Sequence, residues 1–346
     1  MAYTNRSERI ASLFPKLRSY RLEQIEAALF QPDIRSWSQV STLPEDMRAT
    51  LEKEVPFITM TVDKIQSGDF GDTHKAVVTV EGGDQIETVL MLNKRGQYTI
   101  CVSSQIGCAM KCGFCATGKM GLKRSLDSDE IVDQIRVWQQ YLVDHMDEDA
   151  RISNIVYMGM GEPLANYVNV RNSLNIILKR TDIGKTRITV STVGVLPRLE
   201  KLLEDEEWPH IRMAVSLHSA DRKTRKEIVP TSYDHFLPKL ADWSRRYLER
   251  FGNRRHHLTF EYVMLKDVND TARHATLLAN FVNRIGNVRV NLIPYNFTDC
   301  GFLCSTKESI ATFKMVLDNK GVMVTTRKTQ GEDIAAACGQ LIKKKE

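Results

Sequence analysis

The sequence lacks any long hydrophobic segment. None of its apolar runs approaches the roughly 18 residues that a transmembrane helix needs. Its first residues, MAYTNRSERIASLF, lack the apolar core and the small-residue cleavage site of a secretory signal. The chain also lacks internal repeats and low-complexity stretches, which argues against a disordered protein. These absences predict a cytoplasmic globular protein with no membrane partner.

A strong excess of one charge is also missing. The formal net charge is +5 over 346 residues, a mild basic bias that favours nucleic acid only weakly. The hydrophobic content of 42% and the charged content of 26% are ordinary for a soluble protein with a sizeable core. Short basic clusters are more often solvated surface than phosphate contacts. They are Lys123-Arg124, Arg222–Lys226, Arg245-Arg246 and Arg254–His257.

Seven cysteines are present, and four of them fall within fifteen residues, between Cys101 and Cys115. An odd number in a chain of this length does not suit the disulfide framework of a small secreted protein. The cluster is better explained as a metal or redox site.

The hydrophobic pattern divides the chain into three parts. Residues 1–55 read as amphipathic helices, residues 56–95 as short strands separated by turns, and residues 96–346 as strands alternating with helices. Such alternation predicts an α/β fold with a parallel sheet, either barrel-like or doubly wound. The expected strands are 98–104, 152–160, 186–193, 211–218, 258–265, 288–295 and 322–327. The expected helices include 129–146, 167–180, 236–251, 271–285 and 307–320.

Cys108, Cys112 and Cys115 form a CxxxCxxC loop directly after the first of these later strands. Three thiolates hold a 4Fe–4S cluster with one iron left open, and the open iron can chelate S-adenosylmethionine (SAM). A zinc site is the main alternative, because Cys300 and Cys304 offer a second pair. Buried thiols without metal are another. The spacing and the strand context favour iron–sulfur.

Several further motifs occur in order along the chain: CVSSQIGC, CxxxCxxCATG, MGMGEPLAN, STVG, SLHS, YVMLKDVND, NLIPYN and RKTQGEDIAAACGQL. With them the sequence resembles the RlmN/Cfr family of radical SAM RNA adenine methyltransferases, from about residue 20 onward. The resemblance implies a partial (β/α)6 TIM-like radical SAM barrel. It also implies a small N-terminal helical accessory domain that binds RNA, followed by a β extension.

The resemblance also assigns roles to residues. Cys338 matches the cysteine that accepts a methyl group, and Cys101 matches the cysteine that pairs with it in a disulfide to release the product. Glu87 matches the proton acceptor. The positions that match SAM contacts are Gly161, Glu162, Ser191, Ser216, Leu217, His218 and Asn296.

The implied activity is methylation of carbon 2 of an adenine in 23S rRNA, with tRNA as a further candidate substrate. Two SAM molecules are used per turnover, an electron donor such as flavodoxin is needed, and a monomer is expected. Pro163 and the RKTQG stretch favour carbon 2 over carbon 8, the Cfr-like alternative that confers antibiotic resistance. More distant alternatives are a radical SAM enzyme for a non-RNA substrate and a zinc-stabilised RNA-binding module. Departures from the family pattern occur at Ser125, Thr231, Ser232 and Ala335, and Cys300 and Cys304 lie outside that pattern.

Overall fold

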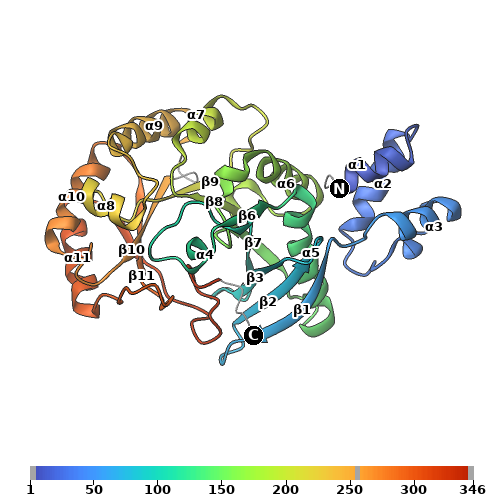
Figure 1. Cartoon of the computed structure of the whole chain (residues 1–346), viewed down its shortest axis with the longest axis horizontal. Helices are drawn as coiled ribbons and strands as arrows, with labels where there is room; N and C mark the ends of the chain where they lie inside the picture. Colours follow the sequence, from blue (N-terminus) through green and yellow to red (C-terminus); the bar gives the residue numbers. More distant parts are fainter. Residues whose placement is uncertain (1–4, 254–257, 342–346) are drawn as a thin grey trace.

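The N-terminal part of the chain is a small helical unit. The structure is a computed structural model that describes residues 5–253 and 258–341, so the basic stretch Arg254–His257 lies outside the described residues. Ile25, Trp37 and Leu51 are at most 1% exposed and belong to a hydrophobic cluster separate from the main core. The unit lies to one side of the rest of the chain, beside α5 (Figure 1). Its helices are α1 (Arg6–Leu13), α2 (Ser19–Leu29) and α3 (Glu45–Glu54).

Three antiparallel strands follow and join the main sheet. They are β1 (Met60–Ser67), β2 (Thr73–Val80) and β3 (Gln85–Leu92), and β3 pairs antiparallel with β4 (Tyr98–Cys101). The β extension expected over 56–95 is therefore continuous with the sheet of the following part of the chain.

From β4 onward the sheet is parallel. It contains β4, β7 (Ile152–Tyr157), β8 (Ile188–Thr192), β9 (Arg212–Ser216), β10 (Leu258–Met264), β11 (Arg289–Pro294) and β12 (Met323–Thr326). The ten strands run in the order β1-β2-β3-β4-β7-β8-β9-β10-β11-β12, so the end strands β1 and β12 do not pair. The sheet is curved (Figure 1). Six strand–helix units followed by β12 confirm the prediction of an α/β partial barrel.

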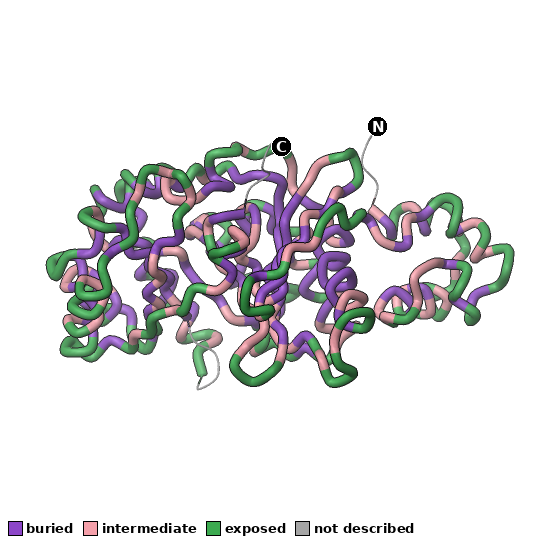
Figure 2. The backbone as a smooth tube through the Cα atoms, turned by 90° about the horizontal axis from the view of Figure 1, so that it is seen from below, coloured by how far each residue is buried: buried purple, intermediate pink, exposed green. Residues whose placement is uncertain are grey.

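Helices cover the outside of the curved sheet (Figure 1). Figure 2 shows buried residues concentrated in the interior of the molecule and exposed residues along its outer coils and loops. Two expected helices, over 167–180 and 236–251, match their predicted bounds, because a clear apolar face is flanked by breaks at both ends. The crossover helices are α5 (Ser128–His145), α6 (Tyr167–Arg180), α7 (Leu196–Glu204), α8 (Arg222–Ile228), α9 (Phe236–Phe251), α10 (Ala272–Asn283) and α11 (Lys307–Asn319).

A short insertion between β4 and α5 carries the cysteine loop. β5 (Gln105–Gly107) pairs antiparallel with β6 (Leu122–Ser125), and α4 (Ala116–Lys119) lies between them. In Figure 1 α4 lies over the open centre of the curved sheet. None of the described helices is long and apolar enough to cross a membrane.

A buried ionic cluster joins the helical unit to α5. Arg6, in the first turn of α1, contacts Asp129 and Asp133 with its guanidinium, and its side chain is 3% exposed. Asp133 also accepts hydrogen bonds from Arg136 and from the backbone and hydroxyl of Thr59. Because every oxygen of Asp133 is engaged, the cluster is a specific connection between the two parts.

Candidate active site

The cysteine loop is compact and buried. Cys108 and Cys112 are buried and Cys115 is half-buried, and all three line one cavity of about 150 Å3. The backbone N–H of Cys115 donates to the Cys112 carbonyl at 3.1 Å, which closes a tight turn. Gly118 packs against this turn so closely that a Cβ there would lie 3.0 Å from the Cys112 oxygen. The backbone therefore holds the three thiols on one wall.

These thiols suit an iron–sulfur cluster. Burial raises the pKa of Cys108 to about 12, so without cations nearby this sulfur would stay protonated, whereas iron holds it as thiolate. Within the described residues, no three His, Cys, Asp or Glu side chains gather closely enough to hold a single metal ion. Three thiols on one compact loop fit a 4Fe–4S cluster in which three irons each take one cysteine and the fourth iron stays open.

A glycine turn after β7 forms a second wall of the cavity. Gly161 has a φ of +101°, and a Cβ there would lie 2.5 Å from the Cβ of Gln105, so only glycine fits. The carboxylate of the next residue, Glu162, accepts hydrogen bonds from the backbone N–H groups of Leu164 at 2.9 Å and Val193 at 2.8 Å. Burial raises the pKa of Glu162, while these bonds oppose the shift. Both predicted residues therefore lie on the cavity in fixed positions.

Ser191, Ser216 and His218 come from the ends of β8 and β9. The hydroxyl oxygens of the two serines are 3.4 Å apart. His218 has a left-handed φ of +55°, its ring meets Phe114 edge-on, and its Nδ1 accepts from the backbone N–H of Val263 at 3.1 Å. Burial, aided by nearby cationic charge, lowers the pKa of His218 to about 3. The ring is therefore neutral, and the bond to Nδ1 places its proton on Nε2.

Leu217, the remaining predicted residue of this stretch, is fully buried and lies outside the cavity wall. Its backbone N–H donates to the Glu261 carbonyl at 3.0 Å, so its contribution is to hold the turn between Ser216 and His218.

A row of polar side chains crosses four neighbouring strands at one level. Ser216 pairs in register with Glu261, Glu261 with Asn291, and Asn291 with Thr325. The amide of Asn291 donates to Glu261 Oε1 at 3.0 Å, and the Thr325 hydroxyl donates to Asn291. The sequence reasoning missed Glu261, although it lies on the cavity wall. An acidic residue inside the buried strand LTFEYVML was the signal available.

The loop that carries Cys338 closes the cavity. The Cys338 side chain is exposed and lines the same cavity as the three cysteines of the CxxxCxxC loop. Asn296 donates to the Cys338 carbonyl at 3.1 Å and accepts from the Thr329 hydroxyl at 3.1 Å. The backbone N–H of Ala116 donates to the Gly339 carbonyl at 2.8 Å. The predicted methyl carrier is thus held beside the cysteine loop.

Cys101 and Glu87 are not among the residues that line the cavity. Cys101 is buried in β4, and burial together with the neighbouring Cys338 raises its pKa to about 12. Both cysteines are free thiols in this structure. Glu87, on β3, is buried outside the residues that line the cavity and forms an ion pair with Lys75 at 3.1 Å. Lys75 also donates to the Ala335 carbonyl at 3.3 Å, which links this pair to the Cys338 loop.

The four departures from the family pattern lie in different surroundings. Ala335 adopts a left-handed φ of +51°, and the Ser125 hydroxyl accepts from Gln105 at 3.2 Å. Ser232 is buried, and its neighbour Thr231 is exposed. Cys300 and Cys304 do not line the cavity.

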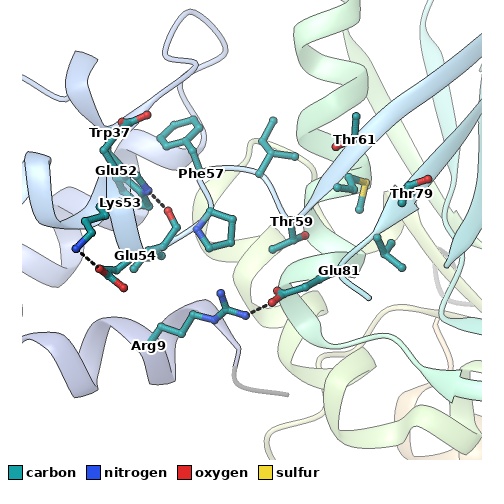
Figure 3. A pocket seen from close by; sticks show the side chains of 15 residues that line it. Arg9, Trp37, Glu52, Lys53, Glu54, Phe57, Thr59, Thr61, Thr79 and Glu81 are labelled. Carbon is teal, nitrogen blue, oxygen red and sulfur yellow. Dashed lines mark hydrogen bonds and ion pairs between the residues drawn. The ribbon is translucent and has the colours of Figure 1, made fainter. Parts of the chain in front are cut away.

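A larger cavity, of about 470 Å3, lies between the helical unit and the β1–β2 hairpin (Figure 3). Its described lining contains no cysteine and includes Glu52, Glu54 and Glu81. Arg9 pairs with Glu81 at 2.5 Å, and Lys53 pairs with Glu54 at 3.2 Å. A surplus of carboxylates does not attract RNA phosphates. The smaller cavity, with its thiols, is therefore the candidate active site.

Comparisons with known proteins agree with this geometry. A model of the radical SAM superfamily matches residues 102–278. A probable dual-specificity RNA methyltransferase RlmN from Dictyoglomus thermophilum is 40% identical over 326 residues, which are 93% of this chain and 90% of that protein. A dual-specificity RNA methyltransferase RlmN from Alcanivorax borkumensis is 39% identical over 336 residues, covering 94% of this chain and 85% of that protein. The chain belongs to the RlmN family of the radical SAM superfamily.

The crystal structure of a radical SAM methyltransferase from Sphaerobacter thermophilus has the same fold. It superimposes with a TM-score of 0.87 at 34% identity and covers 98% of this chain and 97% of that one. Membership of the RlmN family confirms the predicted family and fold, and it implies a 4Fe–4S cluster and SAM as cofactors. A zinc-stabilised module is not favoured.

Proposed function

We propose that the protein methylates carbon 2 of an adenine in 23S rRNA and in tRNA, with Cys338 as the carrier of the methyl group. One observation carries the proposal: the Cys338 side chain opens onto the same cavity as Cys108, Cys112 and Cys115. The relatives' names, dual-specificity RNA methyltransferases, support RNA as the substrate.

The cavity residues have different proposed roles. When bound, the cluster and two SAM molecules per turnover supply the methyl group and the radical chemistry that an electron-poor adenine carbon requires. The three loop cysteines hold the iron. Gly161 and Glu162 hold the methionine part of SAM, and the other contacts come from Ser191, Ser216, His218 and Asn296, while Leu217 holds the turn between Ser216 and His218.

Cys338 presents its sulfur to the cavity while Asn296 anchors its carbonyl. Cys338 lies close enough to Cys101 to contribute to the raised pKa of Cys101, as two residues that pair during product release must. Glu87 receives the proton from the adenine carbon, and its partner Lys75 couples it to the Cys338 loop. The target adenine leaves its helix to reach this cavity.

The helical unit over residues 1–55 supplies RNA contacts. Lys16, Arg18 and Tyr20 are exposed around the start of α2, and the Arg21 guanidinium lies 5.0 Å over the Tyr20 ring. Cations neutralise phosphates, and exposed aromatic rings stack on unpaired bases. These residues therefore suit single-stranded or loop RNA. The unit works together with the β extension (56–95) and the catalytic domain (96–346). The protein acts as a monomer, and an electron carrier such as flavodoxin reduces its cluster.

The decisive experiment compares RNA from cells with and without the gene. Digested rRNA and tRNA are analysed by mass spectrometry for methylated adenosines. Loss of 2-methyladenosine is expected, with restoration by the wild-type gene and by Cys304→Ala but not by Cys338→Ala. Loss of 8-methyladenosine instead would assign the other carbon, and no change in either nucleoside would refute the proposal.

Purified protein gives an independent check. Anaerobic preparations should be brown, with about four irons per chain. Cys338→Ala should still cleave SAM reductively, because the cluster ligands and SAM contacts remain, yet transfer no methyl group to RNA. Normal methylation by this variant would show that Cys338 is not the carrier.

A further inference from the structure

Arg327 reaches two sulfur atoms in the active-site cavity. The residue follows β12, and its backbone N–H donates to the Leu292 carbonyl at 2.8 Å, which fixes its position against β11. Its Nη1 lies 3.8 Å from Cys338 Sγ, and Nη1 and Nη2 lie 3.5 and 3.6 Å from Met158 Sδ. The guanidinium therefore contacts both the thiol of Cys338 and the thioether of Met158.

The charged surroundings of Arg327 come from three other elements. Burial alone would lower the pKa of Arg327, but Glu261 on β10, Cys338 on its loop and Cys101 on β4 raise it on balance. Among the described residues, no carboxylate lies within ion-pair distance of the guanidinium. A thiolate at Cys338 is thus the nearest anion that this cation can meet directly.

We propose that Arg327 is a positioning residue that holds the Cys338 sulfur toward the cavity and favours its thiolate form. The inference rests on the proposed function of Cys338 as a methyl carrier. A thiolate, not a thiol, is the effective nucleophile toward a sulfonium. The thiol proton passes to water, the Cys338 sulfur forms a bond to the methyl carbon, and the bond from that carbon to the sulfonium breaks. S-adenosylhomocysteine leaves, and no oxidant is needed.

The same geometry predicts a change after methylation. The thiolate and the sulfonium neutralise each other, so methylated Cys338 is an uncharged thioether and a weak hydrogen-bond acceptor. Arg327 then loses its anionic partner on the loop. The interaction between Arg327 and the Cys338 sulfur is therefore strongest before the first methyl transfer, when the orientation of the sulfur matters.

Alkylation of Cys338 by iodoacetamide tests this without RNA or turnover. Cluster-loaded protein is treated anaerobically between pH 7 and 10, and peptide mass spectrometry gives the rate for the unmethylated fraction. The variants are Arg327→Met and Arg327→Lys, with Lys328→Met as the matched control because Lys328 is the exposed neighbouring cation. Cys304 is exposed and provides an internal reference for access and folding.

The loss of the Arg327 charge should change how the alkylation rate of Cys338 depends on pH. Losing a nearby cation lowers the thiolate fraction at pH 7 about tenfold, while the more basic thiolate that results is about threefold more nucleophilic. Arg327→Met should therefore react about threefold more slowly than wild type at pH 7 and about threefold faster at pH 10. Arg327→Lys should lie between the two. Equal profiles, or one constant ratio at every pH, would overturn the inference.

A second measurement separates this inference from the proposed function. Methyl-labelled SAM is added, and label on the Cys338 peptide is followed. Slower labelling in Arg327→Met, with alkylation profiles of wild type and variant that cross, supports both the role of Arg327 and the carrier function of Cys338. Crossing profiles with no label on wild-type Cys338 would support the role of Arg327 and refute the carrier function. Normal labelling with superimposable profiles would refute the role of Arg327 alone.

Discussion

The buried cluster around Arg6 predicts how firmly the helical unit is held to the catalytic part. Replacing Arg6 by Met removes a guanidinium that is 3% exposed from the carboxylates of Asp129 and Asp133. Removing one partner of a buried ion pair costs about 3–5 kcal/mol. Asp133 retains Arg136 and Thr59, so we expect the lower end, about 3 kcal/mol.

The same helix provides a matched control. Arg9, one turn later, pairs with Glu81, but the two side chains are 23% and 41% exposed. An ion pair this exposed contributes less than about 1 kcal/mol. Arg9→Met therefore removes a charge and a contact to the β1–β2 hairpin at little cost.

Hydrogen exchange of the amides in α1 to α3, read by mass spectrometry, measures the opening of the helical unit. A loss of about 3 kcal/mol raises the open fraction about 150-fold, whereas Arg9→Met should raise it less than about fivefold. Reductive SAM cleavage should survive in Arg6→Met while RNA methylation falls. If the two variants exchange alike, the buried cluster does not hold the unit in place.

Three further substitutions test the cavity wall. Gly161→Ala should lose SAM binding at least tenfold in a titration, because its Cβ would collide with Gln105, whereas Gly184→Ala meets no atom within 4 Å and should bind normally. Glu162→Gln leaves one backbone N–H without an acceptor and should cost about 1–3 kcal/mol in urea unfolding; unchanged stability would contradict this. The pKa of His218 is lowered in the folded state to about 3, so its stabilising contribution is complete above about pH 6.5 and is lost as the pH falls toward 3. Between pH 7 and 5.5 wild type should lose about 1 kcal/mol more stability than His218→Asn, which suits the left-handed backbone; parallel losses would argue against a buried neutral ring.

Much of the fold follows from local pattern. The helix over 236–251 was predicted at its observed bounds, because its apolar residues recur at helical spacing and a glycine follows it. The two strands around the cysteine loop escaped prediction, since β5 has three residues and β6 four, too few to show alternation. Their pairing is imposed by the loop between them.

The candidate site could likewise be predicted only in part. The identities of Cys108, Gly161 and Cys338 could be taken from motifs, because each lies in a short specific pattern. The contacts of Glu261 and Arg327 could not, since these depend on the register between strands far apart in sequence. Glu261 meets Asn291 only because β10 and β11 align at that level. No local pattern encodes such an alignment.

The bonds that close the cavity have a consequence for biosynthesis. The Thr117 hydroxyl donates to the Leu341 carbonyl, 224 residues later, and Ala116 donates to Gly339. A ribosome adds about 5–20 residues each second, so the cysteine loop exists for ten seconds or more before its partner emerges. During that interval the thiols lack the wall that later shields them, and iron has its widest access. Cluster insertion can thus precede closure, and a chain truncated before Cys338 would keep the three proposed cluster ligands but lack the proposed methyl carrier.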